Sequence, residues 1–138
     1  MVTPIGEFFY DLANGRDVNL KVKKGFQVGV RVVVPPYPFR DKKTFNSYSK
    51  RAVVVFKKAD NMEGVHIEDV KVVRGEWIVA GNAGVVLIVV GMGLTMKEAQ
   101  RQAYLRIQNV LIPNMYYRMD IGDRWYEEGD KLLMWGMI

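Results

Sequence analysis

The chain has 138 residues, no cysteine, a single histidine and a formal net charge of +5 at pH 7. This length suits one compact domain, and a hydrophobic share of 49% is ample for a core without disulfides or metals. The lack of cysteine excludes a disulfide framework, thiolate metal sites and cysteine nucleophiles. We therefore expect one domain over residues 1–138, in a reducing compartment and hence in the cytoplasm.

Membrane insertion is not expected. The first residues lack the basic-then-apolar order of a signal peptide. The longest apolar run, residues 85–90, is far shorter than the roughly 20 residues that cross a bilayer.

Positive charge is concentrated in the first half of the chain. Residues 16–58 contain twelve Lys and Arg against two acids, whereas the remainder holds eight basic and thirteen acidic residues. A basic segment can attract nucleic acid or phosphate, but this one is interleaved with apolar runs, so a solvated face is the simpler explanation. A phosphate-bearing substrate or a domain partner remains an alternative, and nucleic acid is the less favoured partner.

The first half of the chain predicts one helix and two strands. Residues 4–14 have helical apolar spacing and end at an Asn-Gly pair. Residues 20–24 alternate apolar and basic side chains, as a strand with one wet face does. Residues 28–34 are valine-rich around Arg31, predict a well-covered strand, and are followed by three prolines that end it. The polar residues 40–50 predict a loop.

The second half begins with a series of strands. Residues 52–56 and the alternating residues 65–73 predict two of them. Arg74-Gly75 indicates a hairpin turn, after which residues 76–80 return as a strand. Residues 85–90 follow as a buried, apolar strand.

Residues 96–111 predict the one long helix. Thr95 and Glu98 form a capping box at its start, and Pro113 ends it. Its apolar stripe consists of Met96, Ala99, Ala103, Ile107, Val110 and Leu111. The expected fold is therefore α+β and β-rich, with antiparallel hairpins in a half-barrel-like sheet, the long helix packed on that sheet, and a short N-terminal helix.

The sequence shows no convincing catalytic triad, metal site or phosphate-binding loop. His66 is the one histidine, and its place in an alternating strand favours an ordinary edge or surface histidine over a catalytic base. Glu68 and Asp69 beside it are too few for a metal site. Gly91-Met-Gly93 precedes a helix, but Met96 occupies the place of the third glycine of a G-x-G-x-x-G loop, so a plain strand-to-helix turn is favoured.

Arg118 and Asp120 stand out because they lie in an apolar frame, next to Met119 and Ile121. Burying such charges without a partner is costly, so both are expected to bond to something specific. A structural ion pair or turn anchor and a substrate contact are equally compatible with these residues.

Four segments keep a characteristic order along the chain. They are Val32-Val-Val-Pro-Pro-Tyr37-Pro38, Gly84-Val-Val-Leu-Ile-Val-Val-Gly-Met-Gly93, Glu98-Ala-Gln-Arg-Gln-Ala103-Tyr104 and Tyr117-Arg118-Met-Asp120-Ile-Gly122. From about residue 5 to 125 this order resembles the C-terminal domain of the phosphoribosylamine–glycine ligase (glycinamide ribonucleotide synthetase) family, within the ATP-grasp superfamily. The chain departs from that pattern at Val85, at residues 67–70 and in an apolar extension over residues 126–138.

The resemblance implies a ligase that joins glycine to phosphoribosylamine with ATP in de novo purine biosynthesis. It implies that this chain helps to wall the active site and docks on the N-terminal and ATP-grasp parts, which would hold ATP and Mg. No catalytic residue and no metal site is expected in this chain, and the fragment alone is not expected to be active. The substrate-binding residues that it implies are Tyr37, Pro38, Arg118, Asp120 and Gly122.

Two alternatives remain. One is a stand-alone binding module that uses the basic residues 16–58 for nucleic acid or phosphorylated ligands. The other is a small enzyme built on His66, Arg118 and Asp120. The apolar residues 126–138 either form an interface or pack on the chain's own core, and the sequence does not decide between these.

Overall fold

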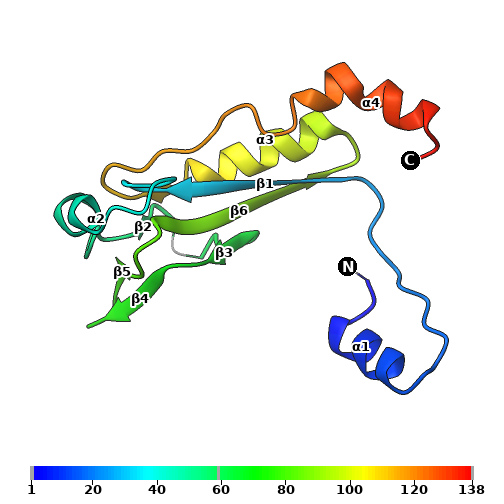
Figure 1. Ribbon diagram of the computed structural model, residues 1–138, viewed down its shortest axis with the longest axis horizontal. Helices are drawn as coiled ribbons and strands as arrows, with labels where there is room; N and C mark the ends of the chain where they lie inside the picture. The colour runs from blue at the N-terminus through cyan, green and yellow to red at the C-terminus, as the bar shows by residue number, and fades with distance from the viewer. Residues whose placement is uncertain (1, 59, 138) are drawn as a thin grey trace.

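The computed structural model describes residues 2–58 and 60–137 and shows an α+β fold with antiparallel sheets, which confirms the predicted class (Figure 1). A long sheet carries one helix on its face, and two small sheets and three further helices surround this unit. The elements are α1 (Ile5–Ala13), β1 (Phe26–Val33), α2 (Lys42–Tyr48), β2 (Val55–Phe56), β3 (Val65–Ile67), β4 (Val70–Val73), β5 (Glu76–Val79), β6 (Val85–Gly93), α3 (Met96–Ile107), β7 (Val110–Leu111) and α4 (Arg124–Met134).

The strands form three antiparallel sheets. The main sheet has the order β1-β6-β3, and its register pairs Val30 with Val89 and Val65 with Val89. The second sheet joins β2 to β7, and the third is the β4-β5 hairpin. Arg74 and Gly75 at the tip of that hairpin both have positive φ, as a tight two-residue turn requires, so the predicted turn is confirmed.

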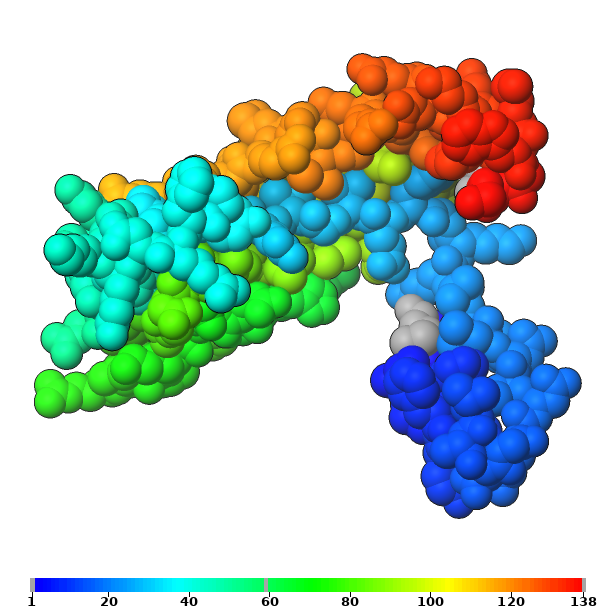
Figure 2. Space-filling model, viewed as in Figure 1, coloured from blue at the N-terminus to red at the C-terminus, as the bar shows by residue number. Residues whose placement is uncertain are grey.

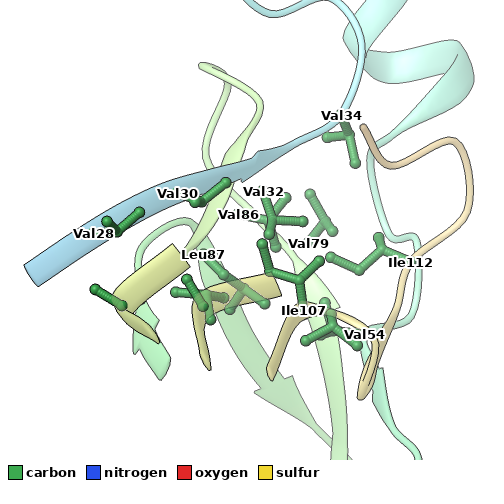
Figure 3. Packing of buried hydrophobic residues seen from close by; sticks show 14 of the residues in the cluster. Val28, Val30, Val32, Val34, Val54, Val79, Val86, Leu87, Ile107 and Ile112 are labelled. Atoms are coloured by element: carbon green, nitrogen blue, oxygen red, sulfur yellow. The ribbon is translucent and has the colours of Figure 1, made fainter. Parts of the chain in front are cut away.

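The core lies between the main sheet and α3 (Figure 3). Alternate residues of a strand point to opposite faces, so one face of β1 and β6 supplies the apolar side chains that meet the helix. Ala99, Ala103 and Ile107 recur at helical spacing on α3 and are fully buried, as the predicted stripe required. The buried strand residues of this core include Val28, Val30, Val32, Val86, Leu87 and Val89.

Small residues let α3 approach β6 closely. A Cβ atom added at Gly91 would lie 2.9 Å from the Cα of Ala103, and nearer still to the backbone of Ala99 and Ala103. At Gly93 an added Cβ would lie 2.8 Å from the backbone nitrogen of Ala99. These two glycines are therefore packing residues at the end of β6, just before the turn into α3, and not a phosphate-binding loop, in agreement with the interpretation favoured from the sequence.

The start of α3 has the predicted capping box. The Thr95 hydroxyl accepts from the Glu98 N–H at 3.2 Å, and the Glu98 carboxylate accepts from the Thr95 N–H at 3.1 Å. The helix ends at Ile107, however, and not at residue 111, because Val110 leaves it to pair with Phe56 of β2. The predicted C-terminal end of this helix was wrong.

Three predictions for other elements were also wrong. Residues 20–24 are irregular; Lys21 bonds with Val2 and Thr3, and no strand ladder forms. Residues 40–50 are not a loop, because the Asp41 carboxylate caps α2 by accepting from the N–H groups at positions 43 and 44. The predicted strand at 65–73 is two strands, since the ladder with β6 ends at Ile67 and β4 pairs with β5 instead.

Two peripheral helices expose apolar side chains. Helix α1 has no buried residue, and Figure 2 shows that the N-terminal segment projects away from the body of the molecule. Helix α4 contacts the body through Trp125, whose ring meets that of Phe26 edge-on at 4.7 Å, while Met134 and Trp135 stay exposed. Helix α4 thus packs through one side and exposes the other. Across the described residues, no helix is both long and apolar enough to cross a membrane.

Candidate functional site

A hollow of about 360 Å³ lies between β1 and the segment that leads from β7 to α4, which runs beside β1 in Figure 1. Small-molecule sites typically have volumes of about 300–1,000 Å³, so this hollow has room for a small ligand. Its lining combines apolar side chains with tyrosines and two arginines. The lining residues are Gly29, Val30, Arg31, Val33, Tyr37, Tyr116, Tyr117, Arg118 and Ile121.

One end of the hollow is closed by a short bridge between β1 and Tyr116. The N–H of Val33 donates to the Tyr116 carbonyl at 3.0 Å, and the Tyr116 N–H donates back at 2.9 Å. The Tyr116 hydroxyl donates to the carbonyl of Tyr37, and burial raises the pKa of that hydroxyl. Tyr37 in turn accepts a hydrogen bond from the Arg31 guanidinium at 3.3 Å. These bonds join three separate segments at one point.

Arg118 and Asp120 pair with each other. The guanidinium donates two bonds to the carboxylate, of 2.8 Å and 2.5 Å, in a fork geometry. This pairing lowers the pKa of Asp120 and raises the pKa of Arg118. Both side chains are exposed, at 73% and 54%, so the pair is a local ion pair on the rim of the hollow and carries little stabilisation.

Tyr104 of α3 holds the segment that carries this pair. Its hydroxyl donates to the Arg118 carbonyl at 3.2 Å and accepts from the Ile121 N–H at 3.2 Å. Burial raises the pKa of this phenol. Gln100, one turn earlier on α3, donates to the Ile121 carbonyl at 3.0 Å. The Ala-Tyr helix and the R-x-D-I-G segment are therefore joined by hydrogen bonds.

The five residues expected to bind substrate do not all converge. Tyr37 and Arg118 line the hollow, and Asp120 reaches it through its bonds to Arg118. Pro38 is exposed and is not among the lining residues. Gly122 has a φ of +96° and packs on α3, where an added Cβ would lie 2.9 Å from the sulfur of Met96. A positive φ of this size is strained for any residue with a side chain, so this position favours glycine.

Arg31 and Tyr116 were not among the expected binding residues, yet both line the hollow. The sequence did carry a signal for Arg31, which is the one charged residue in a valine-rich strand. Tyr116 precedes the R-x-D-I-G segment directly, but nothing in the sequence shows that it bridges to β1.

His66 does not belong to this site. It is exposed on β3, opposite Ile88, and is not among the residues that line the hollow. The hypothesis of an enzyme built on His66, Arg118 and Asp120 therefore has no geometric support. Within residues 2–58 and 60–137, no three His, Cys, Asp or Glu side chains are grouped closely enough to hold a metal ion, so the described donors do not fit a Mg site.

The basic residues of positions 16–58 do not form one face. Lys21, Lys23 and Lys24 lie in the segment between α1 and β1, whereas Arg40 and Arg51 flank α2. Figure 1 shows α1 and α2 at opposite ends of the molecule. Because the charge is divided in this way, the basic residues between positions 16 and 58 of the described chain do not form the continuous surface that nucleic-acid binding would use.

The part of the chain that forms the hollow matches a known protein family. Residues 27–124 match the family described as phosphoribosylglycinamide synthetase, C domain, which is well over half of the chain. The chain belongs to this family. All of the residues that line the hollow fall within the matched range, while α1 and most of α4 lie outside it.

This C domain also resembles a solved structure. The crystal structure of phosphoribosylamine–glycine ligase from Thermotoga maritima superposes with a TM-score of 0.64 and 25% sequence identity. The match covers 80% of this chain and 25% of the ligase chain, so this C domain spans about a quarter of the length of that enzyme. The resemblance inferred from the sequence motifs is confirmed.

Proposed function

We propose that this chain is the C-terminal portion of a phosphoribosylamine–glycine ligase, which forms glycinamide ribonucleotide from glycine, phosphoribosylamine and ATP in purine biosynthesis. The observation that carries this proposal is the family match over residues 27–124, supported by the structural likeness to one quarter of the Thermotoga ligase. Because the match covers a quarter of the ligase, this chain would form only one part of the complete enzyme. This role suggests a location in the cytoplasm.

In this role the C domain forms part of the wall of the active site. The hollow beside β1 is the surface that faces the substrate, with Tyr37 and Arg118 as contacts and Asp120 fixing the orientation of the Arg118 guanidinium. Gly122 packs on Met96 of α3, and neither Gly122 nor Pro38 lines the hollow, so neither is assigned a substrate contact. The chain's contribution is to bind and orient substrate.

The ATP and Mg that the family uses would be held by the remaining portions of the enzyme. ATP supplies the phosphoryl group that activates the glycine carboxylate. Among the described residues, no carboxylate lines the hollow, Asp120 is engaged by Arg118 at its rim, and no acidic side chains are grouped closely enough to hold a metal ion. The residues of this chain are therefore assigned no part in phosphoryl transfer.

Docking on the N-terminal and ATP-grasp parts would cover the exposed apolar side chains of the two peripheral helices. On α1, Phe9 and Leu12 are 58% and 55% exposed, and on α4 Met134 is 82% exposed. Exposed apolar patches commonly mark an interface. We propose that residues 1–138 act as one unit, in which 126–138 extend the family domain towards that partner.

A growth test addresses the proposal. In a bacterial strain that requires purine because it lacks this ligase, co-expression of the chain with the remaining portions of its ligase should restore growth. The chain alone and the remaining portions alone are the two controls, and both should leave the purine requirement unchanged. Growth supported equally well without the chain would remove the proposed role.

A further inference from the structure

On the edge of β1 that faces the hollow, the backbone groups of Gly29 and Arg31 make no hydrogen bond to another described residue. Val34 donates to Gly84 on the β6 side, whereas Val33 bonds with Tyr116 on the opposite side. Since successive residues of a strand direct their backbone groups to alternate sides, Arg31 and Gly29 share the side of Val33. Beyond Tyr116 the neighbouring chain moves away from β1, and the hollow opens there.

The register of β6 gives the same orientation independently. Val90 is the partner of Gly29 in the ladder, and the Val90 N–H donates to the Gly64 carbonyl, away from β1. Paired residues of an antiparallel ladder direct their backbone groups either towards each other or away from each other. The N–H and C=O groups of Gly29 therefore point to the open edge, as those of Arg31 do.

Arg31 supplies a positive charge at the same place. Its guanidinium bonds to the Tyr37 hydroxyl at 3.3 Å, and no carboxylate of the described residues lies within ion-pair distance of it. Arg118, the other arginine of the hollow, already has both carboxylate oxygens of Asp120. Of the two guanidinium groups, that of Arg31 is the one free to receive an anion.

The remaining walls are apolar and aromatic. The other lining residues of the hollow include Val30, Val33, Ile121, Tyr116 and Tyr117. A site with such walls and a few directed polar groups binds a ligand that has an apolar or ring-shaped body and one charged end. Arginine recognises carboxylate and phosphate alike through paired N–H donors.

We propose that this hollow is an anion-binding subsite, in which Arg31 holds the carboxylate or phosphate of a small ring-containing ligand. The open N–H groups of Gly29 and Arg31 add donors along the strand edge, and the Tyr37 hydroxyl positions the guanidinium. The inference rests on the proposed function in one respect: in the complete ligase, the hollow must face the active site. The binding chemistry itself is a property of this chain alone.

Titration of the 138-residue chain with phenyl phosphate and, separately, with phenylacetate tests the subsite. Backbone amide signals of Gly29 and Arg31 should move and saturate in a ¹H–¹⁵N correlation spectrum. Arg31→Gln should weaken binding by roughly tenfold, as expected for the loss of a charged hydrogen bond. The matched control Arg101→Gln changes an exposed arginine of α3 outside the hollow and should leave the affinity within about twofold.

The two probes separate the sources of the anion, since the tighter binder identifies phosphate or carboxylate as the ligand's charged end. Tyr37→Phe should weaken binding less than Arg31→Gln does. Absence of saturable shifts at Gly29 and Arg31, or equal loss of affinity in the Arg31 and Arg101 variants, would overturn the proposal. Restored purine-independent growth without probe binding would remove this inference alone, whereas probe binding without restored growth would remove the proposed function alone.

Discussion

Replacing Gly91 by alanine tests the close approach of α3 to β6. The added Cβ would lie 2.9 Å from the Ala103 Cα, about 0.5 Å short of ordinary contact, and would press harder on the backbone of Ala99. Overpacking typically costs about 1–3 kcal/mol. Because backbone atoms of a helix cannot rotate away, we expect a value near the upper end, about 3 kcal/mol.

Urea denaturation followed by circular dichroism measures this cost. With a slope of about 1–3 kcal/mol per M, a loss of about 3 kcal/mol lowers the midpoint by at least about 1 M. Gly29→Ala is the matched control on the paired strand, since its added Cβ would meet the nearest atom, in Ile88, at an ordinary 3.8 Å. That variant should stay within about 1 kcal/mol of the parent chain. Equal destabilisation by the two substitutions would refute the packing account.

Three further substitutions test the ion pair of the site, the cap of α3 and the hydrogen bonds of Tyr104. Arg118→Ala should raise the pKa of Asp120 towards its ordinary value, as read from a ¹³C carboxyl titration. In the parent chain, the stability linked to the lowered pKa is fully present above about pH 3.8 and is lost as the pH falls through the lowered pKa. An unchanged pKa would mean that the fork does not persist in solution. Thr95→Ala should lower the free energy of unfolding by about 1 kcal/mol through loss of the helix cap, while Thr95→Ser should retain most of it. Tyr104→Phe removes both bonds of the hydroxyl, so the amide of Ile121 should exchange faster with deuterium, and an unaltered exchange rate would contradict the bridging role.

Local signals in the sequence predicted the central elements well. The capping box at Thr95 fixed the start of α3, and the alanine spacing identified its buried face. The valine-rich residues predicted β1, and the Arg74-Gly75 pair predicted the β4-β5 hairpin. Each of these signals acts within a few residues, so no knowledge of the tertiary fold was needed.

The errors arose where distant segments decide the local structure. Residues 20–24 have a strand pattern but no partner strand, and a strand needs one. Residues 108–111 continue the helical stripe, yet pairing with Phe56 draws Val110 into β7. Asp41 is a residue type that caps helices, but the polar residues around it favoured a loop, so helix α2 was not predicted.

The candidate site was predictable in part for the same reason. Arg118 and Asp120 lie two residues apart, and an ion pair was one of the two alternatives that the sequence left open; the structure shows that they pair with each other. The convergence of Arg31, Tyr37 and Tyr116 depends on the path of the chain after β7, which no short pattern encodes. The hollow could therefore be located only from the fold.

The most direct test of the central claim is the rate of glycinamide ribonucleotide formation from glycine, phosphoribosylamine and ATP in a reconstituted mixture. The remaining portions of the ligase should be inactive or nearly so alone, and the rate should rise and saturate as this chain is added. The chain alone should give no product. Turnover by the chain alone, or a full rate from the remaining portions without it, would contradict the account.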